Sequence, residues 1–245
     1  MQNSPPSLSH AFRDWWRDRR ARKGFSQALI ALASELWAFL RDSTPQRERQ
    51  RYGDIDYDWD NHVNTTSAAV GWRNRLLGVF HSPYQPTEPA LFREMLNALD
   101  IDFSQFTFID LGSGKGRTLL MASEYPFRRV VGVELLPELN QLAQQNIREF
   151  KSDARKCATI ESLCEDARDF TFPLEPLLLY LFNPLLESGL VQFVLNMEQS
   201  LREFPRSIIV IYHNPLLANV LDDSPFLKKT SSTHQYSIYR TPTPM

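Results

Sequence analysis

The 245-residue sequence has little of several features that mark particular classes of protein. It contains only two cysteines, Cys157 and Cys164, which do not form a C-x-x-C pair, and no set of cysteines and histidines has zinc-binding spacing. No apolar run approaches the ~20 residues that a membrane-spanning helix needs. These absences predict a reduced, cytoplasmic protein without a metal site or a membrane span.

The sequence also lacks a strong charge of either sign, since its formal net charge is −2 and its pI is about 6.2. Such a balance gives no general attraction toward nucleic acid or an anionic membrane, so nucleic acid is disfavoured as a partner. Alternating aspartates over residues 54–60 superficially resemble a calcium loop. An EF-hand loop needs glycine at its sixth position and glutamate at its twelfth, where this chain has Trp59 and Thr65. Calcium binding there is therefore excluded.

Glycine is scarce too, with nine residues, yet three of them lie at alternate positions, 112, 114 and 116. The apolar run 106–111 before them predicts a buried strand. A helix is expected over 118–124 and a second strand over 129–134, with Glu134 at its tip. Glycines allow positive φ and close approach of a ligand to the backbone, and the following helix directs N–H groups at the turn. The arrangement is typical of a nucleotide-type pocket.

The spacing decides which nucleotide motif this is. A phosphate-binding P-loop needs serine or threonine after its lysine, and here Gly116 follows Lys115. The dinucleotide pattern G-x-G-x-x-G fails because Arg117 occupies the position of the third glycine. What remains is D-x-G-x-G-x-G, followed by an acid at position 134.

This pattern resembles motif I of the class I S-adenosylmethionine (SAM)-dependent methyltransferases, and the wording Phe-Ile-Asp-Leu-Gly-Ser-Gly-Lys-Gly is similar to that of the seven-strand protein-lysine methyltransferases, including the Dot1 type. The resemblance implies an α/β fold with a doubly wound, seven-stranded, mostly parallel sheet and helices between the first five strands. It implies SAM as cofactor and methyl transfer to an acceptor that the sequence does not identify: a small molecule, a peptide or a protein side chain. The alternative is a SAM-fold protein that binds cofactor or a partner without turnover.

The same resemblance implies a set of cofactor-binding residues at the strand tips. Glu134 would accept from the ribose hydroxyls, Asp110 would serve the ammonium of the methionine moiety, and Asp166 would accept from the adenine amino group. The segment with Tyr84 and Thr87 would either offer hydroxyls to the methionine carboxylate or be a plain helix-capping turn. The full predicted set is Tyr84, Thr87, Asp110, Gly112, Ser113, Gly114, Gly116, Glu134, Leu135, Asp166, Ala167 and Asn183.

Two residues are candidates for catalysis. Asn183 ends an apolar strand predicted over 177–182, and Asn183-Pro184-Leu185 resembles motif IV of nitrogen-directed methyltransferases without its second proline and aromatic residue. Its amide would accept a hydrogen bond from a nitrogen nucleophile. His213 follows the strand predicted over 207–212 and is the candidate general base, although a single histidine is more often structural.

The remaining patterns complete the predicted domain organisation. A helix starts at Ser9, breaks at Gly24 and continues as an amphipathic helix to residue 40. Its basic, tryptophan-rich first half would contact a membrane surface, a nucleic acid or a partner, or pack on the catalytic domain as a lid or homodimer contact. Residues 1–80 are thus a helical extension, and 81–245 are the SAM-binding domain. Further elements are expected as helices over 68–80, 90–99, 138–149 and 190–204 and as strands over 158–163, 226–230 and 235–240.

Overall fold

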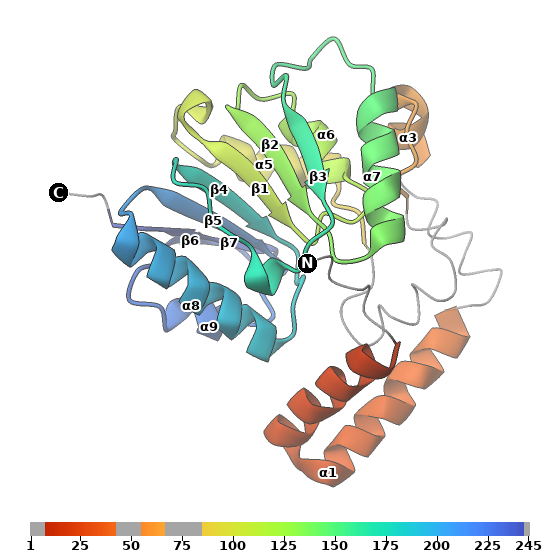
Figure 1. Cartoon of the computed structure of the whole chain (residues 1–245). Coiled ribbons are helices and arrows are strands. Elements are labelled where there is room, and N and C mark those ends of the chain that lie inside the picture. The colour runs from red at the N-terminus through yellow and green to blue at the C-terminus, as the bar shows by residue number, and fades with distance from the viewer. Residues whose placement is uncertain (1–7, 43–54, 67–84, 243–245) are drawn as a thin grey trace.

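The computed structural model describes residues 8–42, 55–66 and 85–242 of the chain. Seven strands form one sheet in the order β3-β2-β1-β4-β5-β7-β6 (Figure 1). Strands β1 to β5 pair in parallel, and β7 lies antiparallel between β5 and β6. The predicted seven-stranded, mostly parallel sheet is confirmed. Its strands are β1 (Thr107–Leu111), β2 (Arg129–Val133), β3 (Ile160–Leu163), β4 (Leu177–Leu181), β5 (Ile208–His213), β6 (Lys228–Ser232) and β7 (Tyr236–Arg240).

Helices cover both faces of the sheet, which is why β1, β4 and β5 are buried at every position rather than at alternate ones. One buried cluster joins the sheet to α5 and α6, and the other joins it to α8 and α9. Residues alternate between the two clusters along β4, with Leu178 in the first and Leu179 in the second. The helices are α5 (Pro89–Asn97), α6 (Arg117–Ala122), α7 (Pro137–Glu149), α8 (Glu187–Glu203) and α9 (Ala218–Asp222), with 3₁₀ turns at Phe103–Gln105 and Ala167–Asp169.

One expected helix is missing. The sequence predicted helices between each of the first five strands, but β3 and β4 are joined through a single 3₁₀ turn, Ala167–Asp169. Pro173 and Pro176 follow this turn, and proline in a helix interior removes a hydrogen bond and clashes with the preceding turn. The chain between these strands instead packs on the face that α8 covers, where Phe170 and Phe172 belong to the same buried cluster as α8.

The amino-terminal part forms α1 (Leu8–Asp42), which contains the predicted break at Gly24, where φ is 78° and ψ is 172°. Figure 1 shows its two arms lying side by side below the sheet. Arg19 on the first arm lies 3.6 Å from Glu35 on the second. A short helix, α3 (Ile55–Asn61), precedes the sheet domain. Within the described ranges no helix is long and apolar enough to cross a membrane. The helix predicted over 68–80 and the residue Tyr84 lie outside the described residues.

Candidate functional site

The glycine-rich turn connects β1 to α6 at the carboxyl end of the sheet. Gly112, Gly114 and Gly116 have φ values of 82°, 55° and 83°, a left-handed conformation that only glycine adopts without strain. A Cβ on Gly112 would also lie 2.7 Å from Cβ of Pro184, which follows β4. The turn is anchored to β2, because the N–H groups of Gly112 and Ser113 donate to the Val133 carbonyl at 2.8 and 3.1 Å.

Glu134, directly after β2, is aimed at this turn. One carboxylate oxygen accepts from the Gly114 N–H at 2.8 Å, and the other accepts from the Leu136 N–H at 2.8 Å. Burial raises the pKa of Glu134, while hydrogen bonds from the N–H groups of Leu136, Gly114 and Leu135 act to lower it. A carboxylate offers about four acceptor positions, so with these three N–H donors it retains capacity for one further hydroxyl.

Asp110, the fourth residue of β1, is buried beside the turn. The Thr118 hydroxyl donates to its carboxylate. Burial raises the pKa of Asp110 to about 7; the Thr118 hydrogen bond opposes this, and the nearby charge of Glu134 adds to it. The Asp110 carboxyl therefore changes its charge near neutral pH.

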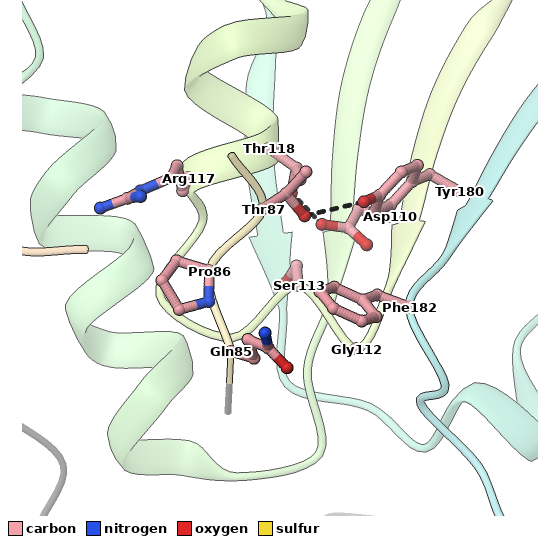
Figure 2. A pocket seen from close by; sticks show the side chains of 10 residues that line it. All are labelled: Gln85, Pro86, Thr87, Asp110, Gly112, Ser113, Arg117, Thr118, Tyr180 and Phe182. Atoms are coloured by element: carbon pink, nitrogen blue, oxygen red, sulfur yellow. Dashed lines mark hydrogen bonds between the residues drawn. The ribbon is translucent and has the colours of Figure 1, made fainter. Parts of the chain in front are cut away.

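A small cavity of about 20 Å³ lies between this carboxyl and the segment before α5 (Figure 2). The Ser113 hydroxyl lines it and is buried without a hydrogen-bond partner among the described residues. An unpaired buried hydroxyl next to a carboxylate is a fitting environment for the polar methionine moiety of SAM. The lining residues are Gln85, Pro86, Thr87, Asp110, Gly112, Ser113, Arg117, Thr118, Tyr180 and Phe182.

Thr87 begins a chain of hydrogen bonds that runs from the segment before α5 to β4 and then to β5. Its hydroxyl is 2.7 Å from the Tyr180 hydroxyl, which is 2.8 Å from Nδ1 of His213. The His213 ring also packs on Phe182 with ring centroids 3.9 Å apart. Burial lowers the pKa of His213 to about 4, so the imidazole is neutral at physiological pH. Sequence reasoning missed Tyr180, because a tyrosine in an apolar strand gives no signal beyond packing.

Asn183 comes two residues after the end of β4, at the same end of the sheet as His213. Its backbone is left-handed, with φ of 46°. Its side-chain oxygen accepts from the Tyr212 hydroxyl at 2.9 Å, and its side-chain nitrogen donates to the Asn214 carbonyl at 2.7 Å. The two residues predicted for catalysis thus lie at the same end of the sheet, but their partners lie on opposite faces, because His213 bonds to Tyr180 and Asn183 bonds to Tyr212. The sequence predicted Tyr212 only as part of the sheet.

Asp166 follows β3, on the other side of β2 from Asp110. Its carboxylate accepts from the Arg168 N–H at 2.9 Å and from the Arg168 guanidinium at 2.5 Å. This ion pair, not foreseen from the sequence, lies next to Ala167, the predicted adenine neighbour. Asp166 raises the pKa of Arg168, and Asp14 of α1 contributes in the same direction.

The first arm of α1 lies against the loop after β2 and the start of α8. Trp15 is 1% exposed and belongs to a cluster that includes Leu136, two residues after Glu134, and Leu186 before α8. Arg22 of the same arm lies 2.8 Å from Glu187 at the start of α8. The amino-terminal helices therefore contact the loops that carry two of the predicted cofactor residues.

Part of the chain is similar to a family of known proteins. The model of the family described as "Histone methylation protein DOT1" matches residues 80–160, about a third of the chain. No curated protein sequence is similar enough to match. An RNA methyltransferase from Salinibacter ruber, solved in complex with S-adenosyl-L-homocysteine, is 22% identical over 66% of this chain and 96% of its own, with a TM-score of 0.45.

A second solved structure is a predicted N6-adenine-specific DNA methylase from Listeria monocytogenes. It is 15% identical over 65% of this chain and 52% of its own, with a TM-score of 0.47. Likenesses at these levels carry no conclusion about the acceptor. The motif around the glycine-rich turn, the family match over it and the strand order agree with one another. The chain therefore has the fold of the class I SAM-dependent methyltransferases, and its glycine-rich turn lies within the part that matches a methyltransferase family.

Proposed function

We propose that this methyltransferase moves the methyl group of SAM to a nitrogen atom of a small molecule or of a protein side chain. The observation that carries the proposal is the amide of Asn183, held at the tip of β4 by Tyr212 and by the Asn214 carbonyl. The match to a family described as acting in histone methylation supports a protein acceptor.

In this proposal the predicted cofactor residues divide by the part of SAM that they bind. Glu134 holds the ribose, and Asp166 with the Ala167 N–H holds the adenine ring. Asp110 and the hydroxyls of Ser113 and Thr87 hold the methionine moiety, with Tyr84 and the three glycines completing the set. Bound SAM supplies a sulfonium that makes its methyl group electrophilic, so the protein mainly provides alignment and a dry pocket.

Asn183 orients the acceptor. Its amide oxygen has two lone pairs, and the Tyr212 hydroxyl uses one of them. The second accepts an N–H of the acceptor, which directs the nitrogen lone pair away from Asn183. His213 is neutral and therefore able to receive a proton, but a pKa near 4 means that it passes the proton on rather than retaining it.

The amino-terminal region is proposed as a lid on the site, with residues 1–80 as extension and 81–245 as the SAM-binding domain. The packing of Trp15 against Leu136 and Leu186 supports this role, because those loops flank the proposed adenosine site. A homodimer contact through α1 stays a prediction.

The test measures binding first and transfer second. Calorimetry on the full chain is expected to detect binding of SAM and S-adenosylhomocysteine (SAH). Glu134→Ala and Asp166→Ala should each weaken SAH binding about tenfold to a hundredfold, since each removes hydrogen bonds to a charged group. Glu165→Ala is the matched control, because this neighbouring carboxylate is exposed.

Transfer is followed with methyl-labelled SAM and a cell extract divided into protein and small-molecule fractions. Label in either fraction that depends on Glu134 supports the proposed enzyme. Binding without any transfer would instead indicate the non-catalytic alternative. Absence of binding to SAM and SAH, combined with binding of NAD or ATP, would contradict the proposal.

A further inference from the structure

Two positively charged side chains lie inside the glycine-rich turn, and the proposed methyl transfer uses neither of them. Lys115 is 0% exposed and Arg117 is 1% exposed. Burying a cation is costly unless it is paired and hydrogen-bonded. The partners of these two side chains therefore indicate what they do.

The partners lie in α3 and in the segment that follows it. The Arg117 Nε donates to the Thr65 hydroxyl at 2.6 Å, and Nη2 of Arg117 lies 3.3 Å from the Asp58 carboxylate. The Lys115 ammonium donates to the Thr66 carbonyl at 2.7 Å. Both cations of the turn thus bind a segment about fifty residues earlier in the chain.

Asp58 organises that segment. Its carboxylate accepts from the N–H groups of Thr65 and Thr66 at 2.7 and 2.8 Å and also from the Thr65 hydroxyl. The side chain next to it, Tyr57, lies under the Arg117 guanidinium at 5.1 Å from ring centroid to Cζ. Asp58 therefore closes residues 58–66 into a loop and at the same time pairs with Arg117.

Asn146 of α7 connects this loop to the backbone of the turn. Its side-chain nitrogen donates to the Lys115 carbonyl at 2.9 Å and to the Asn64 carbonyl at 3.0 Å. Its side-chain oxygen accepts from the Asn64 N–H at 2.8 Å. Asn146 is 1% exposed, so these are buried hydrogen bonds that are costly to break.

A turn with three glycines has more backbone freedom than other turns, and a binding site gains affinity when such freedom is removed beforehand. We propose that Asp58 is a positioning residue for the cofactor: acting through Arg117, it holds the glycine-rich turn in the conformation that receives SAM. The inference rests on the proposed function in that this turn is taken as the SAM site.

The test compares two buried carboxylates. Asp58→Asn keeps the size of the side chain and removes its charge. Glu198→Gln is the matched control, because Glu198 is also buried and accepts from Ser224 at 2.7 Å, but it lies on α8, on the opposite face of the sheet from α6. Both variants are expected to lower the melting temperature, and only Asp58→Asn should weaken SAH binding, by about tenfold.

A milder variant keeps the test decisive if Asp58→Asn folds poorly. Thr65→Val retains the shape of the side chain and removes the hydroxyl that contacts Arg117 and Asp58. It should weaken SAH binding about threefold. In the ligand-free chain, hydrogen exchange of the amides at 112–117 should be faster in Asp58→Asn and Thr65→Val than in Glu198→Gln.

Two failures are distinguishable. A wild-type chain that does not bind SAH would overturn the proposed function. The positioning role alone would be overturned if the wild-type chain binds SAH and the Asp58→Asn and Thr65→Val variants keep wild-type affinity. The same conclusion would follow if these variants lose no more SAH affinity than Glu198→Gln does. Rescue of SAH affinity by Asp58→Glu, which restores the charge, would support it.

Discussion

Asn183, two residues after the end of β4, and Asn214, the residue after β5, both have a left-handed backbone, and the Asn183 side chain donates a 2.7 Å hydrogen bond to the Asn214 carbonyl. Their φ values are 46° and 50°. Asparagine tolerates this conformation better than other non-glycine residues, and such backbone outliers gather at functional sites. The pair fixes the Asn183 amide at the carboxyl end of the sheet, where ligands bind in α/β folds.

Replacing each asparagine by glycine separates the side chain from the backbone conformation, which glycine adopts freely. Asn183→Gly should lower kcat about a hundredfold, because a slightly misplaced acceptor reacts poorly. SAH affinity should change little. Asn214→Gly keeps the carbonyl that Asn183 uses and should retain most activity. Equal losses of kcat in the two variants would contradict an orienting role for the Asn183 side chain.

Asp110 should make SAH binding depend on pH. Its pKa of about 7 in the free protein means that the carboxylate required by an ammonium group forms as the pH rises through neutrality. Calorimetric affinity is expected to increase about tenfold between pH 6 and pH 8. Asp110→Asn should bind more weakly and lose this dependence. If SAH affinity of the Asp110→Asn variant depends on pH as strongly as that of the wild-type chain, a group other than Asp110 causes the pH dependence.

The same raised pKa affects stability with a definite sign. The unfolded Asp110 ionises near 3.8, whereas the folded one ionises near 7. Its contribution to the free energy of unfolding is therefore fully present below 3.8 and is lost as the pH rises through 7. Urea unfolding of Asp110→Asn should show a smaller decrease over this interval than the wild-type chain shows.

His213 should act in the opposite direction. Burial lowers its pKa from 6.5 to about 4. Between pH 4 and pH 6.5 the imidazole is therefore protonated in the unfolded state and neutral in the folded state. Its stabilising effect is full above 6.5 and is lost as the pH falls toward 4. Between pH 7.5 and pH 5 the wild-type chain should lose about 1 to 2 kcal/mol more than His213→Gln in urea unfolding. A pH–rate profile should show no inflection from His213 between pH 5 and pH 8.

Gly112 and Gly24 form a natural comparison, since both are left-handed and only the first is crowded. A Cβ on Gly112 would lie 2.7 Å from Pro184, whereas a Cβ on Gly24 would have no atom within 4 Å. Gly24→Ala should lower the free energy of unfolding by about 1 to 2 kcal/mol because of backbone strain. Gly112→Ala should lower the free energy of unfolding by at least ~1 kcal/mol more than Gly24→Ala, because Pro184 must also move. Thermal unfolding of the two variants measures the difference.

The lid role of α1 is tested with two tryptophans. Trp15 is 1% exposed against the adenosine-side loops, whereas Trp37 on the second arm is 69% exposed. Trp15→Ala should weaken SAH binding and speed hydrogen exchange over residues 8–42, because it removes the buried contact with Leu136 and Leu186. Trp37→Ala should do neither. A Trp15→Ala chain with wild-type SAH affinity would leave α1 outside the cofactor site.

Local patterns carried the prediction of the sheet and of the glycine-rich turn. Apolar runs such as 177–182 signal strands buried on both faces, and three alternate glycines before a helix signal a ligand turn. The helix expected between β3 and β4 is absent. That expectation came from the family pattern, whereas Pro173 and Pro176 in this segment disfavour a helix.

The sequence by itself determined the fold and the cofactor, because the residues that specify them are neighbours in the chain. Only the tertiary structure decided how the site is held: Asp58 pairs with Arg117, Tyr212 holds Asn183, and Trp15 covers Leu136. Each of these contacts joins residues far apart in the sequence. Periodicity and spacing report only local geometry, so contacts of this kind become visible once the sheet has brought the segments together.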